Sequence, residues 1–190
     1  MLSFDKNSIK AENGSIVMHS WETPVIEEMC KWVCKRSDMK PYPDILEIGF
    51  GMGIASDFIQ SRKPNSHTIC ESDPDVLVNL KEWSKDKSNV IIVEGDWYKN
   101  LDKFTTYHGI LFDTFADMNI EKFKNEIVYT LSKDIGTHFC IWDNMTSVDH
   151  PNFKPISSKK IVVKKDIKDS VYAPNDYVYV HKMLITPSDN

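Results

Sequence analysis

The sequence predicts an α/β fold, with a mostly parallel twisted sheet, helices on both of its faces and an antiparallel hairpin at one edge. Between residues 44 and 144, short apolar runs of strand type alternate with segments in which apolar residues repeat at helical spacing. Consecutive parallel strands need such crossovers, which place helices on the sheet. Two later strand-like runs, residues 159–167 and 177–187, are separated by a turn instead of a helix, so we expect them to form the antiparallel edge.

The first expected element is a helix that begins at Thr23 and Pro24. Thr23 offers a hydroxyl at the N-cap, and Pro24 occupies the first helical position, where its missing N–H costs nothing. Apolar residues then repeat at helical spacing and predict one buried stripe: Ile26, Met29, Cys30, Val33 and Cys34. Pro41 and Pro43 are expected to end this helix.

The elements that follow continue the alternation. The expected strands cover residues 44–50, 67–73, 89–96, 109–115 and 137–144. The expected helices cover residues 54–63, a segment begun by Asp73 and Pro74 that carries Val76, Leu77, Leu80 and Trp83, and residues 120–134, with Phe123, Ile127 and Leu131 on one face.

Length and composition suit one globular domain. The chain has 190 residues, of which 41% are hydrophobic and 27% charged, enough to bury about two-thirds of the unfolded surface. No linker rich in Gly, Pro or Ser and no repeat interrupts the pattern. We therefore expect an N-terminal arm or lid, residues 1–22, and a single domain over residues 23–190.

The composition also argues against several classes of protein. The four cysteines, Cys30, Cys34, Cys70 and Cys140, form no CxxC pair, so we expect buried free thiols, a reducing compartment and no metal site. The apolar runs are shorter than a membrane span and MLSFDKNSIK lacks a signal-peptide core, which predicts a cytoplasmic protein without a membrane partner. A net charge of -5 disfavours nucleic acid as a partner, and the basic run SSKKIVVKK is interpreted as the solvated face of a strand.

A glycine-rich turn and a later carboxylate point to a cofactor. In EIGFGMG, Gly49, Gly51 and Gly53 lie between the first strand and the next helix, where the absence of side chains lets the backbone approach a ligand. The pattern alone is weak. Glu71 strengthens it, because it ends the second strand, where a carboxylate can accept hydrogen bonds from both ribose hydroxyls. The pair predicts a cofactor that contains a nucleoside.

The details of the turn favour S-adenosylmethionine over a nicotinamide dinucleotide. A dinucleotide fingerprint reads G-x-G-x-x-G, whereas here the third glycine comes one residue early. Glu47 adds negative charge that repels a diphosphate but attracts a sulfonium and an ammonium group. Asp96 and Trp97 lie at the carboxyl end of the third strand, where the adenine is expected, and Trp97 as a core residue is the alternative.

These residues resemble a known family. The segments VMHSWETP, ILEIGFGMGIAS, ICESD, EGDW, GILFDTF, NMTS and MLITP occur in the same order as in guanidinoacetate N-methyltransferase and related enzymes that methylate guanidino groups. The resemblance runs from Val17 to Pro187 and rests on the combination of WETP, GFGM and FDTF. It implies the Rossmann-like fold of the class I methyltransferases, which use S-adenosylmethionine and release S-adenosylhomocysteine.

The resemblance also implies roles for individual residues. The cofactor side would comprise the loop residues Phe50, Gly51, Met52, Gly53, Ile54 and Ala55, with Glu71 at the ribose and Ser72, Asp73, Trp97 and Tyr98 along the adenosine. The substrate side would comprise Met18, Glu22, Asp113, Met145 and Thr146, with Asp113 near the cofactor as well and Trp21 closing over the site with Met18.

Glu22 and Asp113 are the candidate catalytic residues, because a guanidinium is hard to methylate. Its pKa is above 12, so its neutral form at pH 7 is scarcer than about one part in 10⁵. Two carboxylates can orient the planar guanidinium, and one can accept its proton as the N–C bond forms. The alternatives are a helix cap for Asp113, a first-turn contact for Glu22, packing for Met18 and Trp21, and a strand end for Asn144 and Thr146.

The sequence leaves several hypotheses about the function open. The acceptor is a small guanidino compound or an arginine, and the apparent loss of the family's late helix and a shorter arm would suit a peptide-borne arginine. A second reading keeps the cofactor and replaces the acceptor by another amine or a carboxylate. A third is a noncatalytic partner subunit that binds the cofactor. A homodimer is compatible with each.

Overall fold

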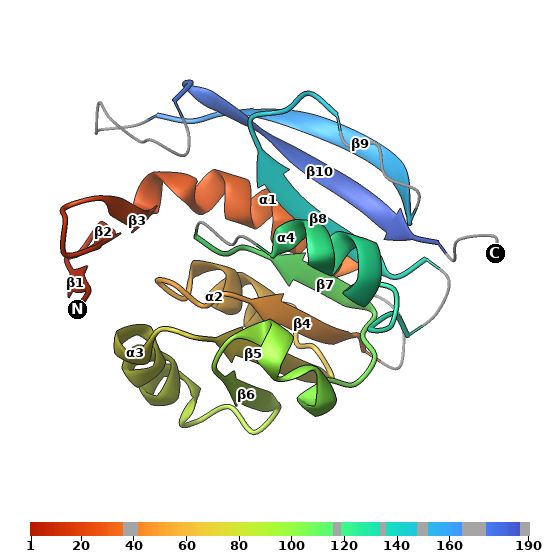
Figure 1. Ribbon diagram of the computed structural model, residues 1–190, viewed down its shortest axis with the longest axis horizontal. Coiled ribbons are helices and arrows are strands. Elements are labelled where there is room, and N and C mark those ends of the chain that lie inside the picture. Colours follow the sequence, from red (N-terminus) through yellow and green to blue (C-terminus); the bar gives the residue numbers. More distant parts are fainter. Residues whose placement is uncertain (36–41, 116–118, 134–135, 148–151, 165–173, 187–190) are drawn as a thin grey trace.

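The fold is built around one seven-stranded sheet (Figure 1). The computed structural model describes residues 1–35, 42–115, 119–133, 136–147, 152–164 and 174–186. The strands lie in the order β6-β5-β4-β7-β8-β10-β9. β4 to β8 are mutually parallel, whereas β10 runs antiparallel to both β8 and β9. The predicted parallel sheet and its antiparallel edge are thus confirmed.

Most of the predicted elements form within a few residues of their expected bounds. The strands are β4 (Asp44–Ile48), β5 (Ser66–Glu71), β6 (Val90–Glu94), β7 (Gly109–Phe112), β8 (His138–Asp143), β9 (Phe153–Val162) and β10 (Tyr177–Ile185). The long helices are α1 (Thr23–Val33), α2 (Ile54–Ser61) and α3 (Pro74–Ser84), and Asp73 caps α3 as predicted. α1 ends before Pro43, and Pro41 lies outside the described residues.

Two apolar cores lie on opposite faces of the sheet because side chains alternate along each strand. On one face, α1, α2 and α3 cover a core that includes Ile45 and Leu111. On the other face, Leu46 and Ile110 belong to an aromatic core with Phe123, which short helical turns cover: η3 (Trp97–Lys99), η4 (Leu101–Lys103), α4 (Ile120–Lys122) and η5 (Phe123–Ile127). In the described segments, no helix combines the length and the apolar character needed to cross a bilayer.

The N-terminal arm is a small sheet, which the sequence reasoning did not anticipate. β1 (Ser3–Phe4), β2 (Ser8–Lys10) and β3 (Ile16–His19) pair antiparallel in that order. This sheet lies beside one end of the main sheet (Figure 1). The backbone N–H of Leu2 donates to Asp75 Oδ2 at 2.7 Å, and Ile9 is fully buried. These contacts attach the arm to α3 and to the core.

The predicted cap of the first helix was wrong. The N-cap of α1 is Glu22, which makes no side-chain capping bond to α1. A 3-10 turn, η1 (Ser20–Glu22), precedes α1, and His19 is the N-cap of η1. His19 Nδ1 accepts from the Trp21 N–H at 3.2 Å, and Glu22 Oε1 accepts from the His19 N–H at 2.6 Å, a reciprocal capping box. Thr23 instead donates its hydroxyl proton to the Ser20 carbonyl at 2.7 Å. A histidine at an N-cap escapes notice because it is uncommon there.

The helix predicted over residues 120–134 is also different. A single α-helical turn, α4, widens into the π-helical turn η5, closed by a 2.8 Å bond from the Val128 N–H to the Phe123 carbonyl. Phe123 and Leu131 are buried as predicted, but Val128 is buried as well and Ile127 only partly so. The wider turn shifts the helical phase, and the end of the prediction at Asp134 lies outside the described residues.

The last hairpin begins earlier than predicted. β9 starts at Phe153, not at Lys159, and the predicted end of that run lies outside the described residues. Pro155, which has no N–H to donate, is tolerated because β9 is an edge strand. Most residues of β9 are exposed, on both faces of the strand. The lysines of the basic run therefore do not all lie on one solvated face, contrary to the prediction from the sequence. Lys159 and Lys182 both pair with Glu28 on α1 and hold the hairpin against that helix.

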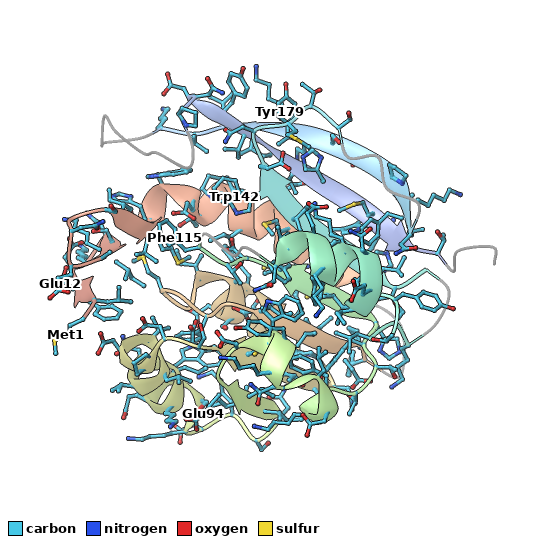
Figure 2. All side chains as sticks on the ribbon, viewed as in Figure 1. Met1, Glu12, Glu94, Phe115, Trp142 and Tyr179 are labelled. Atoms are coloured by element: carbon cyan, nitrogen blue, oxygen red, sulfur yellow. The ribbon has the colours of Figure 1, made fainter. Side chains whose placement is uncertain are left out.

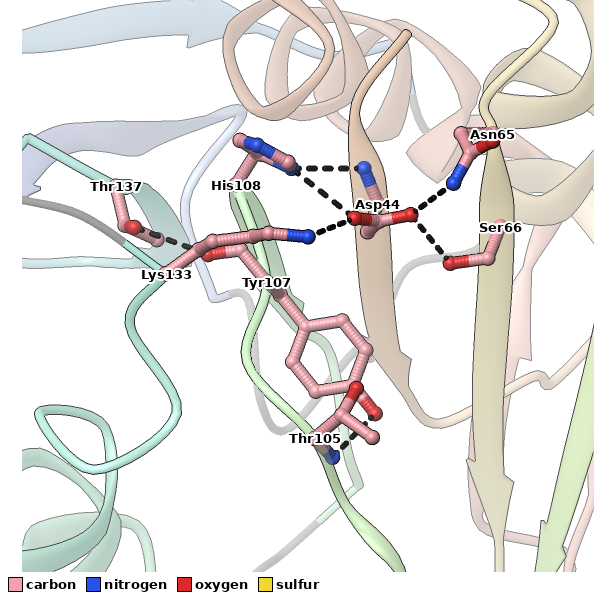
Figure 3. A network of polar contacts seen from close by, with 8 residues as sticks. All are labelled: Asp44, Asn65, Ser66, Thr105, Tyr107, His108, Lys133 and Thr137. Atoms are coloured by element: carbon pink, nitrogen blue, oxygen red, sulfur yellow. Dashed lines mark hydrogen bonds and ion pairs between the residues drawn. The ribbon is translucent and has the colours of Figure 1, made fainter. Parts of the chain in front are cut away.

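Asp44 lies at the amino-terminal edge of the parallel strands (Figure 3). Its carboxylate accepts from Asn65 Nδ2 at 2.6 Å, Ser66 Oγ at 2.8 Å and Lys133 Nζ at 2.6 Å. Burial by itself raises the pKa of Asp44, but these hydrogen bonds and the charge of Lys133 outweigh it and hold the pKa below its ordinary value. Three separate parts of the chain therefore meet at one ionised carboxylate.

We expect Lys133→Met to lower the free energy of unfolding at pH 7 by about 1 kcal/mol, because the Asp44 carboxylate loses a charged partner. The pKa of Asp44 is depressed in the folded protein, so its contribution is complete above its unfolded pKa and disappears as the pH falls through the folded value. The difference between variant and wild type should therefore shrink towards pH 3 in urea titrations. Lys81→Met, which breaks an exposed pair with Glu94, is the control and should cost less than about 0.5 kcal/mol.

Candidate functional site

A cavity of about 870 Å³ opens at the carboxyl ends of the parallel strands. The first residues after β4, β5, β6, β7 and β8 all contribute to its wall, and the N-terminal sheet contributes Leu2, Ile9, Ala11, Val17 and Met18. Two other lining residues, Phe115 and Trp142, are labelled in Figure 2. The chain turns from β4 towards β5 on one side and later returns to β7 on the other, and ligands of open α/β sheets bind at such a switch point.

Gly49 brings the glycine turn into contact with β7. Its φ of +95° is in the left-handed region, and a Cβ at this position would lie 2.1 Å from the Asp113 carbonyl oxygen. The Asp113 N–H donates to the Ile48 carbonyl at 2.9 Å, so a backbone hydrogen bond joins the two strand ends next to this contact. The absence of a side chain at Gly49 therefore positions Asp113 beside the turn.

Gly51 has a different neighbour, the side chain of Met18 from the N-terminal sheet. A Cβ on Gly51 would lie 2.3 Å from Met18 Sδ, and the Met52 N–H donates to the same sulfur at 3.1 Å. Met18 was expected on the substrate side. Met18 lines the cavity. Its sulfur packs on the glycine turn and so connects the N-terminal sheet to that turn.

The Glu71 carboxylate organises the turn from the end of β5. Oε2 accepts from the Phe50 N–H at 2.9 Å, and Oε1 accepts from the N–H groups of Ser72 at 2.7 Å and Asp73 at 2.8 Å. A carboxylate offers about four lone-pair positions, so one of them, on Oε2, is left for a ribose hydroxyl. The sequence predicted that Glu71 binds both ribose hydroxyls. For this, one of its three hydrogen bonds to backbone N–H groups would have to break.

Glu47 lies behind the cavity wall instead of on it. Its side chain is fully buried on β4, where Oε2 accepts from Ser56 Oγ at 2.7 Å and contacts His67 Nε2 at 2.8 Å. Within the described part of the chain, Oε1 has no hydrogen-bond partner. Glu47 therefore contributes its charge to the site, and direct contact with a cofactor would need a rearrangement.

Asp113 lies at the end of β7 and lines the cavity. Trp142 Nε1 donates to its Oδ1 at 2.9 Å. Burial raises the pKa of Asp113 to about 6, the Trp142 hydrogen bond opposes this rise, and the charge of Glu47 adds to it. A carboxyl group with a pKa near the working pH suits a general base.

Glu22 lines the same cavity from the start of the first helical segment and is only 3% exposed. The alternative to a catalytic role was a first-turn contact with the helix dipole or solvent, whereas Glu22 in fact accepts a capping bond from the His19 N–H. The two roles are compatible, because the capping bond engages Oε1 while the carboxyl group borders the cavity. The cap orients the group relative to the helix.

The remaining predicted residues divide between the cavity and its surroundings. Those that line the cavity are Gly49, Gly51, Glu71, Ser72, Asp73, Asp96, Trp97, Tyr98 and Met145. Those that do not line it are Trp21, Glu47, Phe50, Met52, Gly53, Ile54, Ala55 and Thr146. Phe50 and Met52 line a second cavity, of about 260 Å³, beside the N-terminal sheet. Trp97 is compatible with both predicted roles, a cofactor contact and a core residue, because it borders the cavity and packs edge-on against Phe112 and Phe123.

The cavity is acidic. Its acidic lining residues are Glu22, Glu71, Asp73, Asp96, Asp113, Glu121 and Asp143. Among the described residues that line it, the one lysine or arginine is Lys124, whose Nζ contacts Glu121 Oε1 at 2.6 Å. Such a wall attracts cations and repels anionic ligands.

Part of the cavity wall was not predicted from the sequence. Trp142 and Asp143 were seen as the end of a strand without a role, although the carboxyl end of a parallel strand is where ligand contacts gather. The apolar contribution of the N-terminal sheet carried no comparable signal, because it depends on how that sheet docks. The cavity as a whole suits a nucleoside cofactor with a cationic end: its volume is within the usual range for ligand sites, and Glu71 retains an acceptor position.

The strand order and the glycine turn after the first parallel strand define the Rossmann-like fold of the class I methyltransferases. Fibrillarin from Aeropyrum pernix, solved with natively bound S-adenosyl-L-methionine, superposes with a TM-score of 0.56 at 11% identity and covers 95% of this chain and 97% of its own. Residues 3–135 match the family model described as Guanidinoacetate N-methyltransferase. The chain belongs to this family.

Fungal relatives share the same region. The chain is 40% identical over 119 residues to Protein arginine N-methyltransferase 2 of Saccharomyces cerevisiae, covering 60% of this chain and 29% of that protein. It is 38% identical over 126 residues to the protein of the same name from Candida glabrata, covering 61% and 30%. The chain thus spans less than a third of the length of these relatives.

We expect Gly49→Ala to weaken binding of S-adenosylhomocysteine at least tenfold and to lower the unfolding free energy by about 3 kcal/mol, because the new methyl group collides with backbone. Gly136→Ala is a matched control, since Gly136 has a φ of +94° but nothing within 4 Å of the added Cβ. The control should lose only about 1–2 kcal/mol from backbone strain and bind normally. Calorimetry and urea titration measure both; equal effects of the two substitutions would show that the contact with Asp113 is unimportant.

Proposed function

We propose that the protein is an S-adenosylmethionine-dependent N-methyltransferase that acts on the guanidino group of an arginine in a peptide or protein. The observation that carries this proposal is the placement of two carboxylates, Glu22 and Asp113, on one cavity with the glycine turn and Glu71. The family and the names of the relatives support the same chemistry.

The cofactor would be held by the glycine turn and by residues that follow β5 and β6. Glu71 Oε2 would accept from a ribose hydroxyl, and Asp96 and Tyr98 border the part of the cavity where an adenine is expected. When bound, the cofactor supplies an electrophilic methyl group on a cationic sulfonium. The acidic wall favours that charge.

The guanidinium of the acceptor is a planar cation, and its proton must leave as the new N–C bond forms. Asp113 would accept this proton, because its raised pKa keeps its basicity above that of an ordinary aspartate. Glu22 would hold the guanidinium by hydrogen bonds and keep the reacting nitrogen oriented. The partly buried setting excludes water and strengthens both interactions.

The charge of the cavity favours a peptide-borne arginine over guanidinoacetate. Guanidinoacetate and free arginine each carry a carboxylate, which would meet the acidic wall, and the cation Lys124 is already paired with Glu121. An arginine inside a peptide has no such carboxylate. The relatives named as protein arginine N-methyltransferases agree with this choice.

Turnover with arginine peptides, free arginine and guanidinoacetate tests the proposal directly. With labelled S-adenosylmethionine and mass spectrometry, the peptide should be methylated with the highest kcat/KM. Methylation of guanidinoacetate alone would limit the acceptor to small molecules. Binding of the cofactor without product from any acceptor would instead support a noncatalytic partner subunit, and methylation of amines or carboxylates only would reject the guanidino assignment.

Asp113→Asn should reduce kcat by about 10² or more, since the proton acceptor is lost while the acceptor for Trp142 is kept. The raised pKa means that the fold favours the protonated form, so ionised Asp113 costs stability as the pH rises from about 4 to above 6. The same variant should therefore be as stable as the wild type, or about 1 kcal/mol more stable, at pH 7.5. A loss of activity together with a clear loss of stability would contradict this assignment.

Glu22→Gln should reduce kcat/KM for the guanidino acceptor by about 10² with little change in stability, because the amide oxygen still accepts from the His19 N–H. Glu22→Ala removes the cap too, and should lose about 1 kcal/mol of unfolding free energy. Comparing the two variants separates recognition from capping. Full activity of the Gln variant would leave Glu22 with the capping role alone.

A further inference from the structure

Two tryptophans that are far apart in the sequence lie beside the proposed catalytic carboxylates, Glu22 and Asp113. Trp142, on β8, donates its indole N–H to Asp113 Oδ1 at 2.9 Å. Trp21, beside Glu22, packs edge-on against Trp142 with ring centroids 6.4 Å apart. Trp142 also lines the cavity, whereas Trp21 does not.

We infer that Trp142 is a positioning residue for Asp113: its N–H binds one carboxylate oxygen and leaves the other to face the acceptor guanidinium. This inference rests on the proposed function. An indole suits the task, because it has one donor, no acceptor and a fixed planar shape.

The backbone of Asp113 is already fixed by its N–H bond to Ile48 and by the contact of its carbonyl with Gly49. The rotation of the carboxyl group remains to be set, and among the described residues Trp142 is the side chain whose hydrogen bond sets it. Trp21 packs edge-on against the Trp142 ring and restricts its orientation. The contact therefore links the WETP segment to the proton acceptor through two rings.

The titratable groups that interact electrostatically with Asp113 do not stabilise its charge. Glu47 on β4 repels it. Cys30 on α1 and Cys140 on β8 stay neutral, because burial raises the pKa of each thiol far above neutrality. Trp142 is the donor that favours the ionised form, and it opposes the effects of burial and of Glu47.

Other acids share the cavity with Asp113. Glu22 stands at the start of the first helical segment, Glu71 follows the glycine turn in the wall, and Asp143 is the neighbour of Trp142 on β8. Asp143 Oδ1 contacts His181 Nε2 at 2.8 Å and accepts from the Met145 N–H at 2.6 Å. None of these acids donates to Asp113 when ionised, so the indole N–H has no substitute among them.

Trp142→Phe keeps an aromatic ring, although a smaller one, and removes the donor. The carboxyl carbon of Asp113, followed by NMR without substrate, should then titrate about 1 unit higher than in the wild type. The acid limb of the kcat/KM profile should move by the same amount, so that kcat/KM falls about tenfold below pH 6. Above pH 8, where Asp113 is ionised in both proteins, the loss should be smaller.

Trp83→Phe is the matched control, because Trp83 Nε1 donates to Asp57 Oδ1 at 2.8 Å and neither residue lines the cavity. It should leave the acid limb in place. If Trp142→Phe fails to fold, replacement of Trp142 by β-(3-benzothienyl)alanine preserves the shape and still removes the N–H. An unchanged Asp113 titration in both Trp142 variants would overturn the inference, and this measurement decides it even if no acceptor is methylated.

Discussion

The close approach of the glycine turn to β7 is the constraint on which the site depends. Gly49 lets the Asp113 carbonyl lie where a Cβ would otherwise be, only 2.1 Å from the ideal position of that atom. The Asp113 side chain is consequently presented at the switch point, next to the turn that is expected to hold the cofactor. Any side chain at Gly49 would move these two functions apart.

The groups around this contact are arranged so that structural bonds also orient the chemistry. Glu71 joins the glycine turn to the end of β5 through three backbone N–H groups. Glu22 caps a helical turn and borders the cavity with the same carboxyl group. In each case a side chain that borders the cavity is also held by the fold, and a group held in this way loses less entropy when a ligand binds.

The two edges of the parallel sheet differ in their electrostatics. At the amino edge, Asp44 meets Lys133 and two neutral donors, so its pKa is lowered and its charge stabilises the fold. At the carboxyl edge, Asp113 is partly exposed and has one neutral donor; desolvation of its carboxyl group and the charge of Glu47 raise its pKa to about 6, so its charge costs stability. The cost is concentrated at the site where a basic carboxylate is useful, as expected for a functional group.

The sequence by itself determined the alternation of strands and helices, the glycine turn, Glu71 at the end of β5 and Asp113 after β7, because periodicity and turn chemistry are local properties. It did not determine the small N-terminal sheet, the His19 cap or the π-helical turn at Phe123, since each depends on contacts that compete with local propensity.

Only the tertiary structure decided how the residues meet: that Glu47 lies behind the wall, that Met18 packs on Gly51, and that Trp142 reaches Asp113 from the next strand. These pairings join residues far apart in the chain, and their distances follow from strand order and packing, which no local pattern records.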